Sequence, residues 1–213
     1  MTTTIKTLPG LQPYEATWQA MRDFTEQRDA HTSNQIWVLQ HEAVYTLGQA
    51  GKPEHILNPG QIPIVHCNRG GQVTYHGPGQ VVIYPLIDLH RANMFVKEYV
   101  NTLEEVIIQT LAHFGIENAC RKVKAPGVYV PMADIPGDGL AKIAALGVKV
   151  TKGCTYHGLA INVDMDLQPF YGINPCGYAG LRTIDMRTLG IVVDPSLVAA
   201  YAAKLLQTAF PSE

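Results

Sequence analysis

The sequence contains no Cys-x-x-Cys pair, since its four cysteines, Cys67, Cys120, Cys154 and Cys176, are scattered along the chain. A chain of 213 residues can build a hydrophobic core and does not need a disulfide framework, so we expect free thiols and a cytoplasmic protein. A zinc site built on Cys154 with His157, or on His66 with Cys67, lacks a second pair at ligand spacing. We therefore expect no metal.

Long apolar runs and a strong net charge are also absent. No stretch approaches the roughly 18 apolar residues of a membrane span, and the N-terminal MTTTIKTLPG lacks the apolar segment of a signal peptide. The net charge of -2 provides no basic field for nucleic acid. Charged residues make up only 16% of the chain and hydrophobic residues 46%, which favours a large core or an apolar pocket. The length is compatible with one domain over residues 1–213.

Hydrophobic periodicity predicts an α+β domain with helices packed on a mainly antiparallel sheet. Spacings of three and four residues predict helices over residues 13–32, 93–114 and 196–210. Runs rich in β-branched and aromatic residues predict strands over residues 35–40, 43–48, 72–76, 80–89, 127–130, 141–150 and 158–163.

The segment RGGQVTYHGPGQ, residues 69–80, combines more turn residues than a simple chain reversal needs. Its glycines allow the backbone to approach a ligand closely, although ordinary turn geometry would also explain them. The segment has neither the Gly-Lys-Ser/Thr of a Walker A loop nor the GxGxxG order of a dinucleotide-binding turn. Arg69 and His76 add a permanent and a titratable hydrogen-bond donor, which favours ligand binding.

Cys176 has the most suggestive surroundings of the four thiols, because Asn-Pro and Gly177 in INPCGYAG predict an open turn. A catalytic thiol needs a base or a cation nearby, whereas most cysteines are small buried hydrophobic residues. In AKIAALGVKV, period-two alternation predicts that Lys142 shares an apolar strand face with Ala144, Leu146, Val148 and Val150. Such a lysine either extends its ammonium to the edge of the sheet or exchanges a proton with a thiol.

Four blocks, RGGQVTYHGPGQ, KIAALG, GCTYHGLAINV and INPCGYAG, resemble the lipoyl/octanoyl transferase family in their order and spacing. The resemblance implies the fold of the biotin and lipoate protein ligase catalytic domains. It also implies transfer of an octanoyl or lipoyl group from acyl carrier protein to a lysine, through a cysteine thioester, in lipoate biosynthesis. The partners would be octanoyl-acyl carrier protein and the lipoyl domains of 2-oxoacid dehydrogenases and of the glycine cleavage H protein. The resemblance implies no cofactor, and we expect a monomer that binds neither nucleic acid nor membrane.

Carried over position by position, the family's nucleophile falls on Cys176 and its activating lysine on Lys142. The implied acyl-binding residues are Arg69, Gly70, Gly71, Gln72, Val73, Thr74, Tyr75, His76, Ala145, Leu146, Gly147, Gly158, Leu159 and Ala160. We expect the glycine-rich segment to form one wall of an acyl pocket that is closed at its far end.

Three alternatives remain open from the sequence. An ATP-dependent lipoate or biotin ligase would share the fold but would need a site for an acyl adenylate. A thioesterase would use Cys176 with His76 or His157 and pass the acyl group to water. A non-enzymatic module would bind acyl chains or lipoyl domains without turnover.

Overall fold

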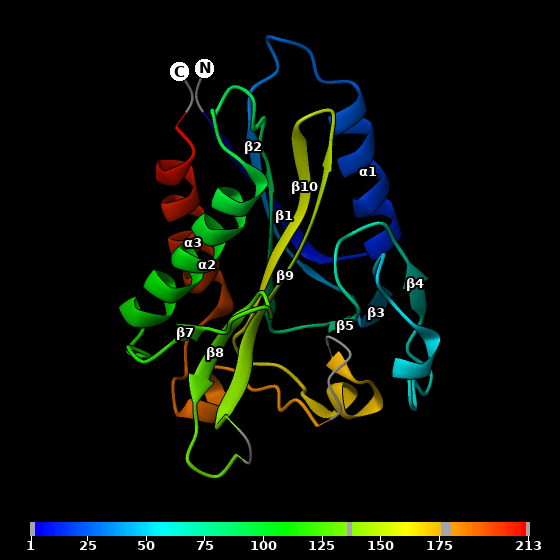
Figure 1. Ribbon diagram of the computed structural model, residues 1–213, viewed down its shortest axis with the longest axis vertical. Helices are drawn as coiled ribbons and strands as arrows, with labels where there is room; N and C mark the ends of the chain where they lie inside the picture. The colour runs from blue at the N-terminus through cyan, green and yellow to red at the C-terminus, as the bar shows by residue number, and fades with distance from the viewer. Residues whose placement is uncertain (1–2, 136–137, 176–179, 212–213) are drawn as a thin grey trace.

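The computed structural model describes residues 3–135, 138–175 and 180–211, and its centre is a seven-stranded sheet with the order β1-β2-β6-β10-β9-β8-β7 (Figure 1). The strands of this sheet are β1 (Thr4–Gln12), β2 (Gln35–His41), β6 (Gln80–Leu86), β7 (Cys120–Arg121), β8 (Val128–Pro131), β9 (Leu140–Thr151) and β10 (Cys154–Asn162). Neighbouring strands pair antiparallel, except that β1 runs parallel to β2. The predicted mainly antiparallel sheet is confirmed.

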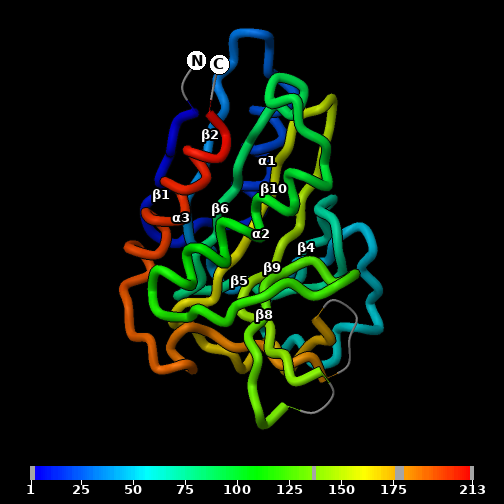
Figure 2. The backbone as a smooth tube through the Cα atoms, turned by 60° about the vertical axis from the view of Figure 1, so that its left-hand side comes forward, coloured from blue at the N-terminus to red at the C-terminus, as the bar shows by residue number. Residues whose placement is uncertain are grey.

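Helices cover both faces of this sheet. Helix α1 (Tyr14–Glu26) packs on one face, whereas α2 (Val96–His113) and α3 (Pro195–Ala209) lie side by side on the other (Figures 1 and 2). Helix α3 begins where its sequence predicts, because Pro195 occupies the first turn and the Asp194 carboxylate accepts a hydrogen bond from Ser196 N at 2.8 Å. The predicted α+β class is confirmed.

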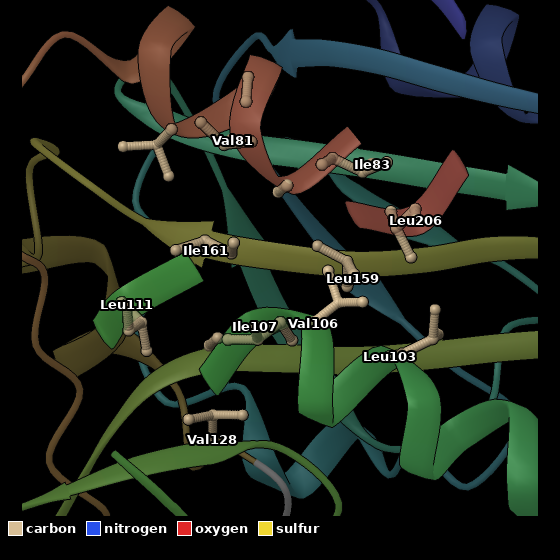
Figure 3. Packing of buried hydrophobic residues seen from close by; sticks show 14 of the residues in the cluster. Val81, Ile83, Leu103, Val106, Ile107, Leu111, Val128, Leu159, Ile161 and Leu206 are labelled. Atoms are coloured by element: carbon tan, nitrogen blue, oxygen red, sulfur yellow. The ribbon is translucent and has the colours of Figure 1, made fainter. Parts of the chain in front are cut away.

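The main hydrophobic core lies between the sheet and the pair α2 and α3. Leu103, Ile107 and Leu111 recur on one side of α2 and pack over Leu159 and Ile161 of β10 (Figure 3). All five side chains are at most 2% exposed. Burying each of them contributes about 1.5–3 kcal/mol, so this layer holds β10 rigidly against the helices.

A second, three-stranded sheet with the order β4-β3-β5 lies beside the main one and carries the glycine-rich segment. Its strands are β3 (Val44–Leu47), β4 (Ile64–His66) and β5 (Val73–His76). The two runs predicted on either side of the Gly-Pro-Gly turn are β5 and β6, and they belong to different sheets. Gly70 N donates to Val148 O of β9 at 3.0 Å, which joins the glycine-rich segment to the main sheet. Short 3-10 helices lie at Pro53–His55, Gln168–Gly172 and Arg187–Leu189.

Strand β9 contains a β-bulge that changes which residues share a face. Lys142 is paired with Tyr129 but Ala144 with Val128, so Ile143 is an extra residue on β9. Both Ile143 and Ala144 therefore belong to the core beneath α2 and α3. The prediction that Lys142 shares the face of Ala144 was wrong, because counting in twos cannot detect an inserted residue. Lys142 instead lies on the opposite face, next to Tyr129.

Candidate active site

One cavity on the α1 side of the sheet brings together most of the predicted acyl-binding residues. It is lined by residues of the three predicted segments, namely Arg69, Gly71, Gln72, Val73, Thr74, His76, Ala145, Leu146, Gly147, Gly158, Leu159 and Ala160. Lys142 lines the same cavity, and so does Pro175, the residue directly before Cys176. Cys176 itself lies outside the described residues.

Two of the predicted acyl-binding residues lie elsewhere. Gly70 lines a neighbouring groove together with Pro126 and Val148. Tyr75 packs in the core of the small sheet, with its ring against Tyr45 and Phe170. The alternation along β5 explains the second case, because Thr74 and Tyr75 point to opposite faces of one strand.

Arg69 holds the glycine-rich segment in place. Its side chain is buried, and its guanidinium donates to Thr46 Oγ1 at 3.0 Å, Thr46 O at 2.5 Å, Gly70 O at 2.9 Å and Gln72 O at 2.7 Å. Opposite it, a Cβ on Gly147 would approach both Arg69 Cδ and Gly70 O to 3.1 Å. The hydrogen bonds tie the loop to Thr46 of β3, and the absence of a side chain at Gly147 lets Arg69 lie close to β9, so Arg69 shapes the wall of the cavity.

His76 occupies the cavity wall as a neutral ring. The amide of Gln80 donates to Tyr75 O and to Asn162 Oδ1, so Gln80 Oε1 is the acceptor for His76 Nδ1–H at 2.7 Å. Burial lowers the pKa of His76 to about 3, and the nearby His41 adds to this effect. His76 Nε2 is therefore a hydrogen-bond acceptor at neutral pH.

His157 is a second neutral ring in this wall, and its tautomer follows from its neighbours. The indole N–H of Trp18, which can only donate, lies 3.1 Å from Asn68 Oδ1 and so identifies that atom as the oxygen. His157 Nε2 therefore donates to the same oxygen at 3.1 Å. Burial lowers the pKa of His157 to about 3. Its Nδ1 is thus an unprotonated acceptor, buried and without a hydrogen-bond partner in the described part of the chain.

Tyr14 and Tyr84 complete this side of the cavity, and sequence reasoning missed both. Tyr14 comes from the start of α1 and stacks on His76 and His157, with ring centroids 5.8 and 6.4 Å apart. His41 Nδ1 donates to Gln12 O at 2.9 Å, so its Nε2 accepts from the Tyr84 hydroxyl at 2.7 Å. Burial lowers the pKa of His41 to about 4. The wall is therefore polar and aromatic but carries no histidine charge at neutral pH.

Lys142 is buried in the wall of the cavity, with only 4% of its surface exposed. Its Nζ donates to Pro126 O at 3.2 Å and lies 5.4 Å from the centre of the Tyr129 ring. Its backbone is fixed as well, because Lys142 N donates to Arg182 O and Lys142 O accepts from Ile184 N. The site thus holds a primary amine in a defined place beside the chain that leads to Cys176.

The three described cysteines, Cys67, Cys120 and Cys154, are free thiols. Burial raises the pKa of Cys154 and of Cys120. Cys67 is buried and accepts a hydrogen bond from the Tyr14 hydroxyl at 3.3 Å. The surroundings of Cys154 and Cys120 therefore do not favour a nucleophilic thiolate.

Within residues 3–135, 138–175 and 180–211, no group of three histidine, cysteine or acidic side chains is arranged to hold a metal ion. In the same ranges no helix is long and apolar enough to cross a membrane.

Curated relatives cover nearly the whole chain. An octanoyltransferase of Bordetella parapertussis is 60% identical over 187 residues, which is 88% of this chain and 84% of the relative. An octanoyltransferase of Bordetella petrii is 58% identical over 207 residues, or 97% of this chain and 96% of the relative.

Solved structures show the same fold at low sequence identity. A bipartite lipoate protein ligase of Thermoplasma acidophilum has a TM-score of 0.73 at 15% identity, covering 97% of this chain and 82% of that chain. A biotin protein ligase of Aquifex aeolicus has a TM-score of 0.54 at 11% identity, covering 98% of this chain and 69% of that chain. The predicted likeness to the biotin and lipoate ligase catalytic domains is confirmed.

Residues 13–200 match the family model described as the lipoyl protein ligase A/B catalytic domain. The family resemblance predicted from the four sequence blocks is thereby confirmed. The chain belongs to the lipoyl protein ligase A/B catalytic domain family and, within it, to the octanoyltransferases.

Proposed function

We propose that this chain transfers an octanoyl group from acyl carrier protein to a lysine of lipoyl domains, through a thioester on Cys176, in lipoate biosynthesis. The observation that carries the proposal is that one cavity is lined by the three segments predicted to bind the acyl chain, by Lys142 and by Pro175. The high identity to octanoyltransferases supports the reaction. The wall is partly apolar and its histidines carry no charge, which suits an alkyl chain because fewer charged groups would lose their hydration when the chain fills the cavity.

In the first transfer, Lys142 takes the proton of the Cys176 thiol, and the thiolate attacks the carbonyl carbon of the octanoyl thioester. The new carbon–sulfur bond forms as the bond to the carrier thiol breaks, and the carrier thiolate takes the proton back from Lys142. The acyl group then resides on Cys176, and Lys142 is again a neutral amine.

In the second transfer, the amine of the lipoyl-domain lysine attacks the acyl-Cys176 carbonyl. Lys142 accepts the proton that this amine loses, the amide bond forms and Cys176 leaves as a thiolate. Return of the proton from Lys142 to Cys176 restores the starting state. The incoming thioester is already activated, so this sequence consumes no ATP.

We further propose that residues 1–213 act as one catalytic domain, as a monomer in the cytoplasm. The free thiols among the described cysteines are typical of a reducing compartment. Size-exclusion chromatography with light scattering should give the mass of one 23.3 kDa chain.

Intact mass spectrometry after incubation with octanoyl-acyl carrier protein, without ATP, tests the mechanism directly. We expect one octanoyl adduct, located on Cys176 by peptide mapping, and its loss in Cys176→Ser. Cys154→Ser is the matched control and should retain the adduct, because the Cys154 thiol is buried. An adduct on Cys154, or modification of lipoyl domains that requires ATP, would contradict the proposal.

The thioesterase alternative differs in the acceptor. Its candidate bases, His76 and His157, each present one unprotonated ring nitrogen in the cavity wall. Adding a lipoyl domain to the isolated octanoyl-enzyme separates the two reactions. Transfer predicts octanoyl-lipoyl domain as the main product, whereas hydrolysis predicts free octanoate at the same rate with and without the domain.

A further inference from the structure

The amino group of Lys142 donates a hydrogen bond to the peptide group that joins Pro126 to Gly127. The carbonyl of this peptide is Pro126 O, which accepts the hydrogen bond from Lys142 Nζ at 3.2 Å. Gly127 has a φ of +141°, and a Cβ added there would come within 2.6 Å of Lys142 Cε. The lysine side chain is therefore packed directly against the backbone of this peptide.

The other side of the same peptide is fixed by a buried carboxylate. Gly127 N donates to Oε1 of Glu104 at 3.0 Å, and Glu104 projects from α2 with only 6% of its surface exposed. A trans peptide is planar, and its N–H and C=O point in opposite directions. Since the described chain has no cis peptide bond, the direction that Glu104 imposes on Gly127 N–H also sets the direction of Pro126 C=O.

The charge of Glu104 adds to this geometric effect. Its second oxygen, Oε2, lies 3.2 Å from Arg121 Nε, and this ion pair keeps the carboxylate oriented towards Gly127. An anionic acceptor on the N–H side polarises the amide and makes its carbonyl oxygen a stronger acceptor. The hydrogen bond from the amino group of Lys142 then depends on both the placement and the polarisation of this amide.

We propose that Glu104 is a positioning residue for Lys142, acting through the Pro126–Gly127 peptide. This inference rests on the proposed role of Lys142 in acyl transfer. Glu104 does not line the cavity that Lys142 lines, and α2 approaches the peptide from the opposite side. Its effect should therefore appear in kcat, with the KM for both protein substrates unchanged.

Two variants of Glu104 distinguish the effect of its side-chain length from the effect of its negative charge. Glu104→Gln keeps an oxygen at the right distance from Gly127 N but loses the charge, whereas Glu104→Asp keeps the charge near Arg121 but is one methylene too short. We expect Glu104→Gln to retain kcat within about fivefold, the difference between a charged and a neutral acceptor. Glu104→Asp should lower kcat by about 10²-fold, because small displacements of a catalytic group cost that much. Equal or higher activity of the Asp variant would refute the positioning role and indicate an ion pair that serves stability alone.

A double-mutant cycle with Lys142→Ala provides the second measurement. If Glu104 acts through Lys142, Glu104→Asp should cause no further loss of kcat in the Lys142→Ala background. A full additional loss would overturn the inference. Glu105→Asp is the matched control, since Glu105 pairs with the same Arg121 at 2.7 Å and is the next residue of α2; its kcat should remain at the wild-type value. If Lys142→Ala alone has wild-type activity, the proposed mechanism fails, independently of Glu104.

Discussion

Lowering the pH from 7 to 5 should destabilise this protein strongly, because three buried histidines are neutral in the folded state. The pKa of His41 is lowered to about 4, and those of His76 and His157 to about 3, in each case mainly by burial. In the unfolded chain each ring titrates near 6.5. The unfolded state therefore binds more protons below pH 6.5, so stability is fully present above that pH and is lost as the pH falls towards 4 and 3.

The size of the effect follows from this difference in proton binding. Each histidine lowers the free energy of unfolding by about 1.4 kcal/mol for every pH unit below 6.5, which amounts to about 2 kcal/mol at pH 5. The three together cost about 6 kcal/mol, comparable with the whole free energy of unfolding of a typical domain. Carboxylates contribute little above pH 5, because their ordinary pKa values lie near 4.

Urea unfolding followed by circular dichroism at pH 7, 6 and 5 measures this loss. Removing one titrating ring by His76→Gln should reduce the pH dependence by about one third, even if the variant is less stable at pH 7. His31→Gln, at an exposed position, is the matched control and should leave the dependence unchanged. A free energy of unfolding that is the same at pH 7 and pH 5 would refute the neutral histidine wall.

Three further predictions concern activity. Lys142→Ala should lower kcat for octanoyl transfer to a lipoyl domain by about 10²- to 10⁴-fold, the range for a positioned acid or base. Lys149→Ala should leave kcat unchanged, and equal losses in the two variants would contradict the role of Lys142. A hexanoyl donor buries two methylenes fewer than an octanoyl donor, so it should lose about 1.6 kcal/mol of binding free energy, or roughly 15-fold in kcat/KM. A dodecanoyl donor that is transferred as fast as octanoyl would exclude a closed pocket. The KM for carrier protein should rise with ionic strength, because salt screens the attraction between exposed lysines and an acidic partner. Arg121 and Lys122 already pair with carboxylates of this chain, so Lys149 and Lys152 are the expected contact residues. A KM that does not change with salt would exclude electrostatic docking.

Elements with strong periodicity could be predicted from the sequence, whereas the edges of the sheet could not. The expected helix at 93–114 is α2 (Val96–His113), and the expected strand at 141–150 is β9 (Leu140–Thr151). Strand β1 was missed because Pro9 and Gly10 suggest a turn. The structure accommodates them through a shift in register between Thr7 and Leu11, on an edge strand where a missing N–H costs little.

The candidate site was predictable only where its residues form motifs. The glycine-rich segment and the GCTYHGLAINV block were found because each gathers several unusual residues in a short stretch. Tyr14 stands alone in an amphipathic helix and reaches His76 and His157 only through the packing of α1 on the sheet. The face of Lys142 depended on one inserted residue, Ile143, and no local pattern marks a bulge.

Arg69 connects the architecture of the loop with the chemistry of the wall. Its guanidinium is satisfied by hydroxyl and carbonyl oxygens, none of which belongs to a carboxylate, so its positive charge is not neutralised by these partners. That charge, after burial, lowers the pKa of His157, and it contributes in the same direction at His76. The residue that holds the glycine-rich segment in place thus also adds to the effect of burial, which is the main reason that the neighbouring rings are unprotonated. Replacing it by a neutral side chain would loosen the wall and raise the pKa of both histidines, so the shape of the cavity and part of the lowering of these pKa values depend on the same side chain.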